Sequence, residues 1–228
     1  RTRAVIINTP WNPTGRVLST VELRSIAEFA VRHDLWIIAD EVYSELVYDD
    51  YKHRSVATLG DDIAARTIIA TSLSKSFAMT GWRVGYCVAP PELAPSLAAL
   101  NQYALRCPTS IAQYAAVTAL NEAASFVDRM RTEYEKRRDV IASRLNGIEG
   151  VVCPLPEGTF YAFARFEEAW GDSRELAVRL LDTAGVLLTP GSAYGPVSRH
   201  HLRFSFATSM ASIEEGLRRL ETALPPAG

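Results

Sequence analysis

Three short apolar runs recur in the first part of the chain, and each leads into polar residues. These runs, rich in β-branched side chains, lie at residues 4–8, 35–39 and 67–71. Runs of this length and composition are typical of strands that are buried on both faces of a parallel sheet. Because a helical pattern separates the first two, the order of strand, helix and strand favours crossover connections. The chain is therefore predicted to be an α/β protein built on a mostly parallel sheet.

The first crossover helix carries a start signal of its own. Ser19 is followed three residues later by Glu22, which is the spacing of a capping box. Beyond it, apolar residues recur at the spacing of one helical face: Leu23, Ile26, Ala27, Ala30 and Val31. We expect this face to cover the sheet.

The remaining elements follow from the same periodicities. Further strands are expected at residues 84–89, 159–166, 186–189 and 202–206, and further helices at residues 92–100, 109–124, 127–145, 173–184 and 212–224. Glycine and proline break the pattern after residue 147. Residues 1–147 are thus predicted to form a partial large α/β domain, and residues 148–228 a smaller C-terminal α+β domain.

The composition narrows the function classes. With 228 residues and 48% hydrophobic side chains, the chain is long enough to bury a sizeable core. The 24 basic and 26 acidic residues are well mixed, so neither a nucleic acid nor a membrane surface is an expected partner. The apolar runs are too short to cross a bilayer. Cys87, Cys107 and Cys153 lack the spacing of a metal site or a disulfide framework, so we expect buried, reduced thiols and a cytoplasmic location. The adjacent His200 and His201 have no third ligand nearby, so we expect them at the surface and expect no metal.

Polar residues follow the first three strands. The first strand leads to Asn12, the second to Asp40 and the third to Ser72. Ligands of open α/β sheets bind outside the carboxyl ends of the parallel strands. Three such endings in succession therefore suggest one shared site along that edge of the sheet.

Lys75 follows Ser72 by three residues. A lysine at the mouth of an apolar sheet is partly desolvated, which favours the neutral amine. A neutral amine is the nucleophile that forms an imine with an aldehyde. Taken alone, however, a solvated surface lysine is the simpler interpretation.

Arg83 and Asp40 suggest complementary ligand groups. A fixed guanidinium with serine hydroxyls nearby suits a phosphate, although Arg83 could equally be a structural residue at a strand start. Asp40 ends an apolar strand, so its carboxylate needs a cationic partner, which a protonated pyridine nitrogen would supply. Tyr43 could reach the same ligand if the chain turns there, or it could be an ordinary half-buried tyrosine.

In order along the chain, these residues resemble a known signature. The pieces are Asn12-Pro13-Thr14-Gly15, Asp40-x-x-Tyr43, Ser72-x-Ser74-Lys75, Arg83 in Gly-x-Arg-x-Gly, and Arg203 in Arg-Phe-Ser-Phe-Ala. Together they are similar to the class I/II aminotransferases, pyridoxal 5'-phosphate (PLP) enzymes of fold type I. The run from Lys75 to Tyr86 is most similar to the bacterial aspartate/prephenate subgroup.

The resemblance implies roles around the cofactor ring. Lys75 is the catalytic residue, which forms the Schiff base with PLP and then moves a proton. Asp40 pairs with the pyridine nitrogen and makes the ring an electron sink. Tyr43 and Asn12 hydrogen-bond the phenolic oxygen of the ring.

The resemblance also implies phosphate and substrate ligands. Ser72 and Arg83 hold the phosphate, with Ser74 close by. Arg203 grips the substrate α-carboxylate and Asn12 assists. From its strand alone, Arg203 could instead be an exposed position. Segments 157–161 and 190–195 resemble family loops near the substrate, or are plain turns.

Members of this family are longer at the N-terminus. The resemblance therefore implies that the N-terminal part of the large domain is missing, and that the isolated chain retains PLP weakly. It implies amino acid and 2-oxo acid substrates, and a homodimer in the full-length protein.

Three alternatives stay open. The first is another fold type I enzyme, such as a PLP-dependent C–S β-lyase. The second, of a different class, is the aminotransferase-like effector domain of a GntR-type transcription regulator. The third is an inactive fragment.

Overall fold

The computed structural model describes residues 1–224 of the chain, and these fall into two compact units. The first comprises Arg1–Pro10 and Val17–Met130. The second comprises Trp11–Arg16 and the chain from Arg131 onward. The two units divide within one long helix, α6 (Ala124–Asn146), whereas the sequence places the domain boundary at its end.

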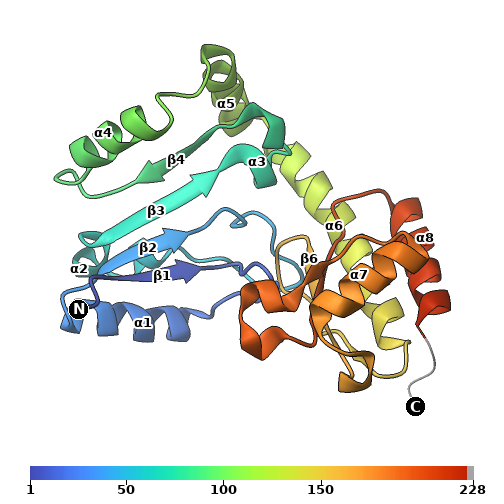
Figure 1. Cartoon of the computed structure of the whole chain (residues 1–228). Helices are drawn as coiled ribbons and strands as arrows, with labels where there is room; N and C mark the ends of the chain where they lie inside the picture. Colours follow the sequence, from blue (N-terminus) through green and yellow to red (C-terminus); the bar gives the residue numbers. More distant parts are fainter. Residues whose placement is uncertain (225–228) are drawn as a thin grey trace. The chain divides into compact units, whose positions relative to one another are not determined.

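The first unit is built on a four-stranded sheet. Its strands are β1 (Ala4–Asn8), β2 (Trp36–Asp40), β3 (Thr67–Ser72) and β4 (Gly85–Val88), in that spatial order. The first three are parallel and β4 runs antiparallel to β3, as the arrow directions in Figure 1 show. The prediction of a mostly parallel sheet is confirmed.

Helix α1 (Thr20–Arg32) connects β1 to β2 and begins at the predicted capping box. The Ser19 hydroxyl accepts from the Glu22 N–H, and the Glu22 carboxylate accepts from the Ser19 N–H at 2.9 Å. The buried residues of α1 share one core with β1, β2 and the segment after them: Ile7, Leu23, Ala27, Ala30, Leu35, Ile37, Ala39, Val56, Leu59 and Ile63. The helix thus covers the sheet with the expected face.

The second crossover is less regular than the first. Between β2 and β3 the chain forms only a 3-10 turn, η1 (Val56–Leu59), and one helical turn, α2 (Asp61–Ala64). After β3 come α3 (Leu73–Ser76) and η2 (Thr80–Trp82), and after β4 the helices α4 (Ala94–Ala104) and α5 (Ser110–Glu122). A second core joins α3 and α5 through Leu73, Met79, Val84, Ala112 and Ala116.

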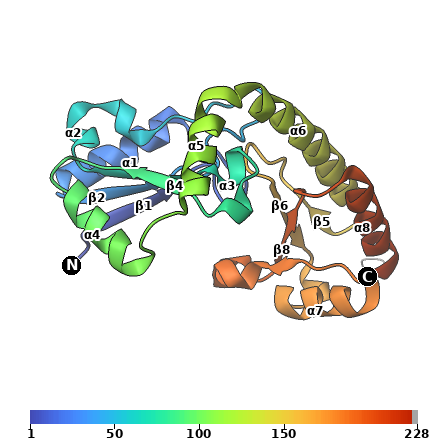
Figure 2. The same cartoon turned by 90° about the horizontal axis from the view of Figure 1, so that it is seen from above.

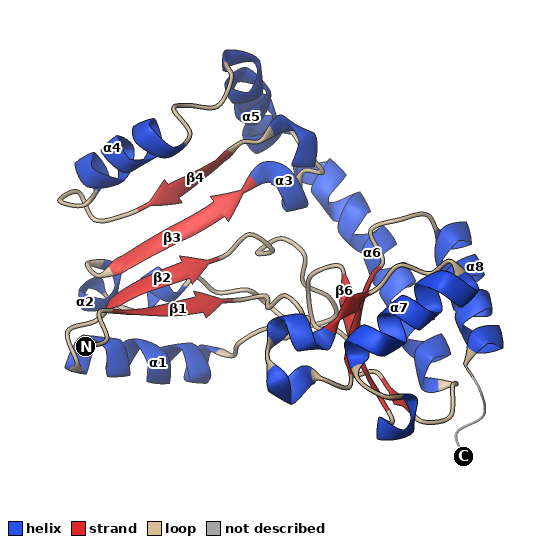
Figure 3. Ribbon diagram, viewed as in Figure 1, coloured by secondary structure: helices blue, strands red, loops and turns tan. Residues whose placement is uncertain are grey.

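The second unit contains an antiparallel sheet with the strand order β5-β6-β8-β7. Its strands are β5 (Val151–Val152), β6 (Tyr161–Phe166), β7 (Thr189–Pro190) and β8 (His201–Ser205). Its helices are α7 (Ser173–Ala184) and α8 (Met210–Ala223), with the 3-10 turns η3 (Glu168–Trp170), η4 (Gly191–Tyr194) and η5 (Pro196–Ser198). Figures 2 and 3 show α7 and α8 with these strands.

Alternation along β6 and β8 separates two faces of this sheet. Ala162 lies opposite Phe204 and Ala164 opposite Leu202, and all four side chains are buried. The intervening positions place Phe163 opposite Arg203 on the other face. The second face therefore carries the arginine that the sequence singles out.

The strand β7 is shorter than predicted. The sequence favours a strand at 186–189, but only Thr189 and Pro190 pair with β8. None of the helices within residues 1–224 combines the length and apolar character that crossing a membrane requires.

Candidate active site

The carboxyl ends of β2 and β3 bring two predicted residues to one edge of the first sheet. Asn8 of β1 pairs with Asp40 of β2, and Asp40 pairs in turn with Ala70 of β3. Ser72 ends β3 two residues later. Asp40 and Ser72 therefore lie at the carboxyl-end edge of the sheet, where the sequence predicts a ligand site.

Asp40 is held by the backbone around it. Its Oδ1 accepts from the N–H of Val42 at 3.2 Å. Its main-chain oxygen accepts from the Asn8 side-chain amide and from the Thr9 N–H, each at 3.2 Å. Tyr43 is buried, and the Glu41 carbonyl accepts from the Ser44 N–H at 3.0 Å, so the chain turns directly after Asp40.

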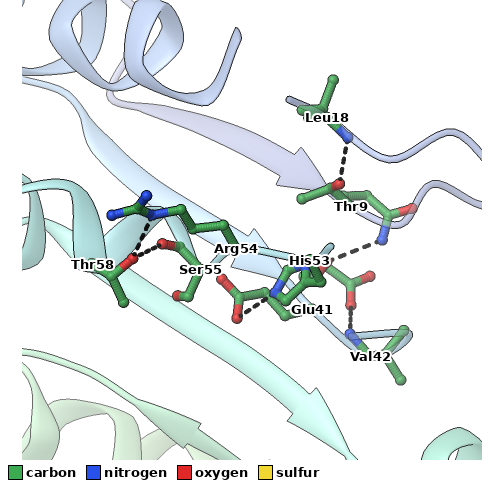
Figure 4. Close-up of polar contacts among 10 residues, drawn as sticks. Thr9, Leu18, Glu41, Val42, His53, Arg54, Ser55 and Thr58 are labelled. Atoms are coloured by element: carbon green, nitrogen blue, oxygen red, sulfur yellow. Dashed lines mark hydrogen bonds and ion pairs between the residues drawn. The ribbon is translucent and has the colours of Figure 1, made fainter. Parts of the chain in front are cut away.

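A close contact between Glu41 and His53, beside Asp40, was not predicted from the sequence. Glu41 Oε2 lies 3.2 Å from His53 Nε2, and both side chains are about nine-tenths buried (Figure 4). A charged residue directly after a buried strand is a signal that such a partner exists. The pair ties the turn after β2 to the segment that precedes η1.

Ser72 caps the short helix that carries Lys75. Its Oγ accepts from the Ser74 N–H at 3.1 Å and lies 2.9 Å from the Ser74 Oγ. Lys75 is partly buried on α3, between the buried residues Ser74 and Ser76. The two hydroxyls and the lysine thus lie on one turn at the end of β3.

Arg83 adopts a left-handed conformation with φ 53°, and its Nη1 donates to the Thr80 carbonyl at 2.9 Å. Two residues later, Gly85 lies against the end of β3, where a Cβ atom would be 2.6 Å from the Thr71 carbonyl oxygen. Val84 O lies 3.2 Å from the Ser72 Oγ. The absence of a side chain at Gly85 therefore permits this close approach.

Some of the predicted cofactor-binding residues line a cavity of about 1180 Å³. Ser72, Ser74 and Arg83 line it, together with residues of β4, α4 and α5. Asp40, Tyr43 and Lys75 are not among its lining residues within the described chain.

The two remaining predicted residues meet in the second unit. Arg203 Nη1 donates to Asn12 Oδ1 at 2.8 Å, across 191 positions of sequence. Its Nη2 donates to the Thr189 Oγ1 at 3.2 Å, and its Nε is buried without a hydrogen-bond partner within residues 1–224. The Arg203 side chain is thus partly buried and fixed by hydrogen bonds, so the alternative of an exposed strand residue is wrong.

Two tyrosines lie against this guanidinium. The Arg203 Cζ is 4.1 Å from the ring centre of Tyr161 and 5.6 Å from that of Tyr194. Burial raises the pKa of Tyr194, and the positive charge of Arg203 opposes that rise. Both tyrosines belong to the segments for which a plain turn was the alternative reading.

The turn after Asn12 is built into the second unit. Gly15 has a φ of 73°, and its carbonyl accepts from the Gly158 N–H at 2.7 Å. A Cβ atom on Gly15 would lie 2.7 Å from the Pro156 Cβ. The buried guanidinium of Arg138, on α6, donates to the Pro156 carbonyl at 3.3 Å. This helix residue therefore supports the segment that packs against the turn after Asn12.

The comparisons with known proteins agree with this geometry. The family model "Aminotransferase class I and II" matches residues 1–220. The chain belongs to the class I and II aminotransferase family. It is 42% identical to the aspartate aminotransferase of Pyrococcus abyssi over 226 residues, which are 98% of this chain and 58% of that protein.

Other aminotransferases are about as similar. A protein of Aquifex aeolicus named "Probable aspartate/prephenate aminotransferase" is 42% identical over 98% of this chain and 58% of its own length. The crystal structure of the aromatic aminotransferase from Pyrococcus horikoshii superposes with a TM-score of 0.92 at 41% identity, covering 97% of this chain and 59% of that one. The chain thus has the fold of these aminotransferases and spans somewhat more than half of their length.

The residues of this aminotransferase chain fit PLP, the cofactor of its family. Ser72, Ser74 and Arg83 line one cavity with donors suited to a phosphate, and Gly85 lies beside them in the same lining. Asp40 supplies a carboxylate and Lys75 an amine at the same sheet edge.

Within residues 1–224, no three His, Cys, Asp or Glu side chains are grouped as metal ligands would be. His200 and His201 are both partly buried, whereas the prediction was a surface position for the pair. The His201 ring stacks on Phe163 with 4.8 Å between ring centres. Burial, together with the charges of Arg165 and His200, lowers the pKa of His201 and so favours the neutral ring.

Proposed function

We propose that the protein carrying this chain is a PLP-dependent aminotransferase that moves an amino group between an L-amino acid and a 2-oxo acid. The observation that carries the proposal is the sheet edge at which β2 ends in Asp40 and β3 leads through Ser72 into Lys75. A carboxylate and an amine at adjacent strand ends, with two serine hydroxyls on the same turn, match what a pyridine ring, an aldehyde and a phosphate require.

In this proposal each residue of the first unit has one task. Bound PLP supplies an electron-poor ring that withdraws electrons from the substrate α-carbon. The Asp40 carboxylate keeps the ring nitrogen protonated, and Tyr43 hydrogen-bonds the phenolic oxygen. The Lys75 amine binds the cofactor and then carries a proton to and from the substrate α-carbon.

The phosphate is held by the residues that line the cavity. The Ser72 and Ser74 hydroxyls donate to phosphate oxygens, and Arg83 supplies the opposite charge. Because Ser72 caps α3, the phosphate anchor and Lys75 belong to one short segment.

Arg203 and Asn12 bind the α-carboxylate of the substrate. A guanidinium presents N–H groups in a fixed fork that matches a carboxylate. Asn12 and Thr189 each accept from one of the five N–H groups of the Arg203 guanidinium, so further N–H groups on Nη1 and Nη2 remain for a ligand. Asn12 also contributes to the phenolic oxygen of the cofactor.

The substrate class follows from the relatives. Proteins named for aspartate, for aspartate/prephenate and for aromatic amino acids are about equally similar to this chain. We propose an aspartate/prephenate type, because the run from Lys75 to Tyr86 is most similar to that subgroup. We also propose that the full-length protein is a homodimer located in the cytoplasm.

The decisive residue is Lys75. We expect the longest natural polypeptide that carries this sequence, mixed with PLP, to show the absorbance of the lysine-bound cofactor. Lys75→Ala should abolish this absorbance and the transfer of amino groups to a 2-oxo acid, because the covalent attachment and the proton carrier are lost together. Absorbance spectra and a coupled transamination assay measure both effects.

Lys52→Ala is the matched control, since Lys52 is an exposed lysine of the same unit. It should leave both readouts unchanged. If Lys75→Ala keeps the absorbance, the lysine assignment is wrong. Pyruvate and ammonia formed without an oxo acid acceptor would favour the C–S β-lyase instead. Cofactor binding without turnover, in a polypeptide with an upstream DNA-binding segment, would favour the GntR-type effector domain.

A further inference from the structure

The guanidinium of Arg203 lies against the ring of a buried tyrosine. Tyr161 is 8% exposed, and its ring centre is 4.1 Å from the Arg203 Cζ. This is close contact for a cation over an aromatic face. The contact is closer than the 5.6 Å between Arg203 and the partly exposed Tyr194.

The strand register makes this contact a consequence of the fold. Arg203 pairs with Phe163 of β6 and with Thr189 of β7. Tyr161 lies two residues before Phe163, so it projects from the same face of β6. Arg203 is therefore approached from both neighbouring strands: by the Thr189 hydroxyl from one side and by the Tyr161 ring diagonally from the other.

The two kinds of contact use different parts of the guanidinium. Hydrogen bonds to Asn12 and Thr189 lie along its edge, through Nη1 and Nη2. An aromatic ring contacts its flat face and competes for none of the N–H groups. The ring can thus fix the plane of the guanidinium while its edge stays available to a carboxylate.

Fixing that plane has a consequence for binding. A free arginine side chain has many rotamers, and ordering it on ligand binding weakens affinity. Tyr161 has only two side-chain torsions and is buried, so its position is already set. A guanidinium that rests on it is ordered before the ligand arrives.

We propose that Tyr161 is a positioning residue for the Arg203 carboxylate clamp, acting through the face of its ring. The inference rests on the proposed function and adds a residue to it. Tyr161 does not itself bind the substrate carboxylate; it determines how Arg203 presents its N–H groups.

The test compares two substitutions at Tyr161 in the full-length protein with PLP. Tyr161→Leu removes the aromatic face and keeps an apolar side chain, and it should lower kcat/KM for the amino acid by about 5- to 30-fold. Tyr161→Phe keeps the face and should stay within about twofold of the unchanged protein. The absorbance of the bound cofactor should be the same in both variants.

A second background separates positioning from general damage. In Arg203→Ala, the further change Tyr161→Leu should have no additional effect on kcat/KM, because the residue through which Tyr161 acts is gone. Equal losses in both backgrounds would overturn the proposal. So would a Tyr161→Phe variant as impaired as Tyr161→Leu, since the hydroxyl would then be the working group.

Carboxylate binding is measured independently of turnover. Succinate titrated by calorimetry should bind more weakly to Tyr161→Leu than to Tyr161→Phe, even in a protein that transfers no amino group. Transamination that depends on Lys75 but not on Tyr161, with unchanged succinate affinity, would sink this inference and leave the proposed function standing. If the protein transfers no amino group but succinate shows the expected difference between the two variants, the proposed function is wrong and this inference stands.

Discussion

Cys153 shows how one residue's surroundings set its chemistry. Its side chain is buried, and its backbone N–H and carbonyl each bond the Asn146 side chain at 2.8 Å. Burial raises the pKa of its thiol to about 12, because the thiolate is disfavoured away from water. Cys87 and Cys107 are exposed, so the prediction of buried thiols is wrong for these two. The three cysteines, alike in the sequence, therefore differ in reactivity.

We expect an aromatic disulfide reagent at pH 8 to modify Cys87 and Cys107 rapidly in the native chain and Cys153 only after denaturation. The thiolate is the reacting form, and Cys153 is neither accessible nor ionised. Mass spectrometry of the labelled chain locates the modified positions. Fast native labelling of Cys153 would show that the segment around it opens.

The same thiol makes stability depend on alkaline pH. The pKa of Cys153 is raised on folding from 9.0 to about 12, so below pH 9 both states keep the proton. Between pH 9 and 12 the unfolded chain loses its proton first, and stability falls by on the order of 4 kcal/mol over that window. Cys153→Ala, compared by denaturant unfolding at pH 8 and pH 10, should reduce this decline.

At the scale of elements, the close pairing of β4 with β3 depends on a glycine. Strand β4 runs antiparallel to β3, and it lies against the end of β3 at Gly85. The Ser72 hydroxyl and the Val84 carbonyl meet at this point. The close approach of two backbones therefore places the predicted phosphate ligands.

Gly85→Ala should destabilise the chain by about 1–3 kcal/mol, since the added methyl would meet the Thr71 carbonyl oxygen at 2.6 Å. Thermal unfolding followed by circular dichroism measures the change. Gly81→Ala is the matched control: nothing lies within 4 Å of its added Cβ, so stability should change by less than about 0.5 kcal/mol. Equal effects of the two substitutions would contradict the close-approach argument.

At the scale of the molecule, the first unit exposes much apolar surface. Helix α4 has no buried residue. Exposed apolar side chains gather on α4, on α5 and between them: Leu100, Tyr103, Leu105, Ile111, Tyr114, Val117 and Leu120. Strands β1 and β4 are the edges of their sheet. Surfaces of this kind bind other protein surfaces or cause self-association.

We expect the isolated 228-residue chain to self-associate at micromolar concentration and to retain PLP weakly. Leu105→Ser combined with Ile111→Ser should reduce the self-association measured by sedimentation velocity, because both side chains are more than 70% exposed. Val178→Ser on α7 is the control, since it removes an exposed apolar side chain elsewhere. A chain that stays monomeric without any substitution would contradict the prediction.

Most elements of the fold were predictable because their signals are local. The capping box at Ser19 and Glu22 and the apolar face beyond it define α1 within one continuous stretch of the chain, Thr20–Arg32. Helix α7 has the predicted bounds, Ser173–Ala184, between a capping aspartate and Gly185 in the left-handed conformation. The strand β7 was predicted too early, because pairing with β8 and not local composition decides which residues join that sheet.

By itself, the sequence determined the parallel strands of the first sheet, the longer helices, and which residue types could serve PLP, since periodicity, caps and strand-end polarity are properties of neighbouring residues. The one-turn helices α2 and α3 were not predicted. Only the tertiary structure decided that β4 runs antiparallel, that Glu41 pairs with His53, and that Arg203 reaches Asn12 and Tyr161. These contacts join positions far apart in the chain. Their geometry depends on strand register and side-chain packing, which local patterns do not encode.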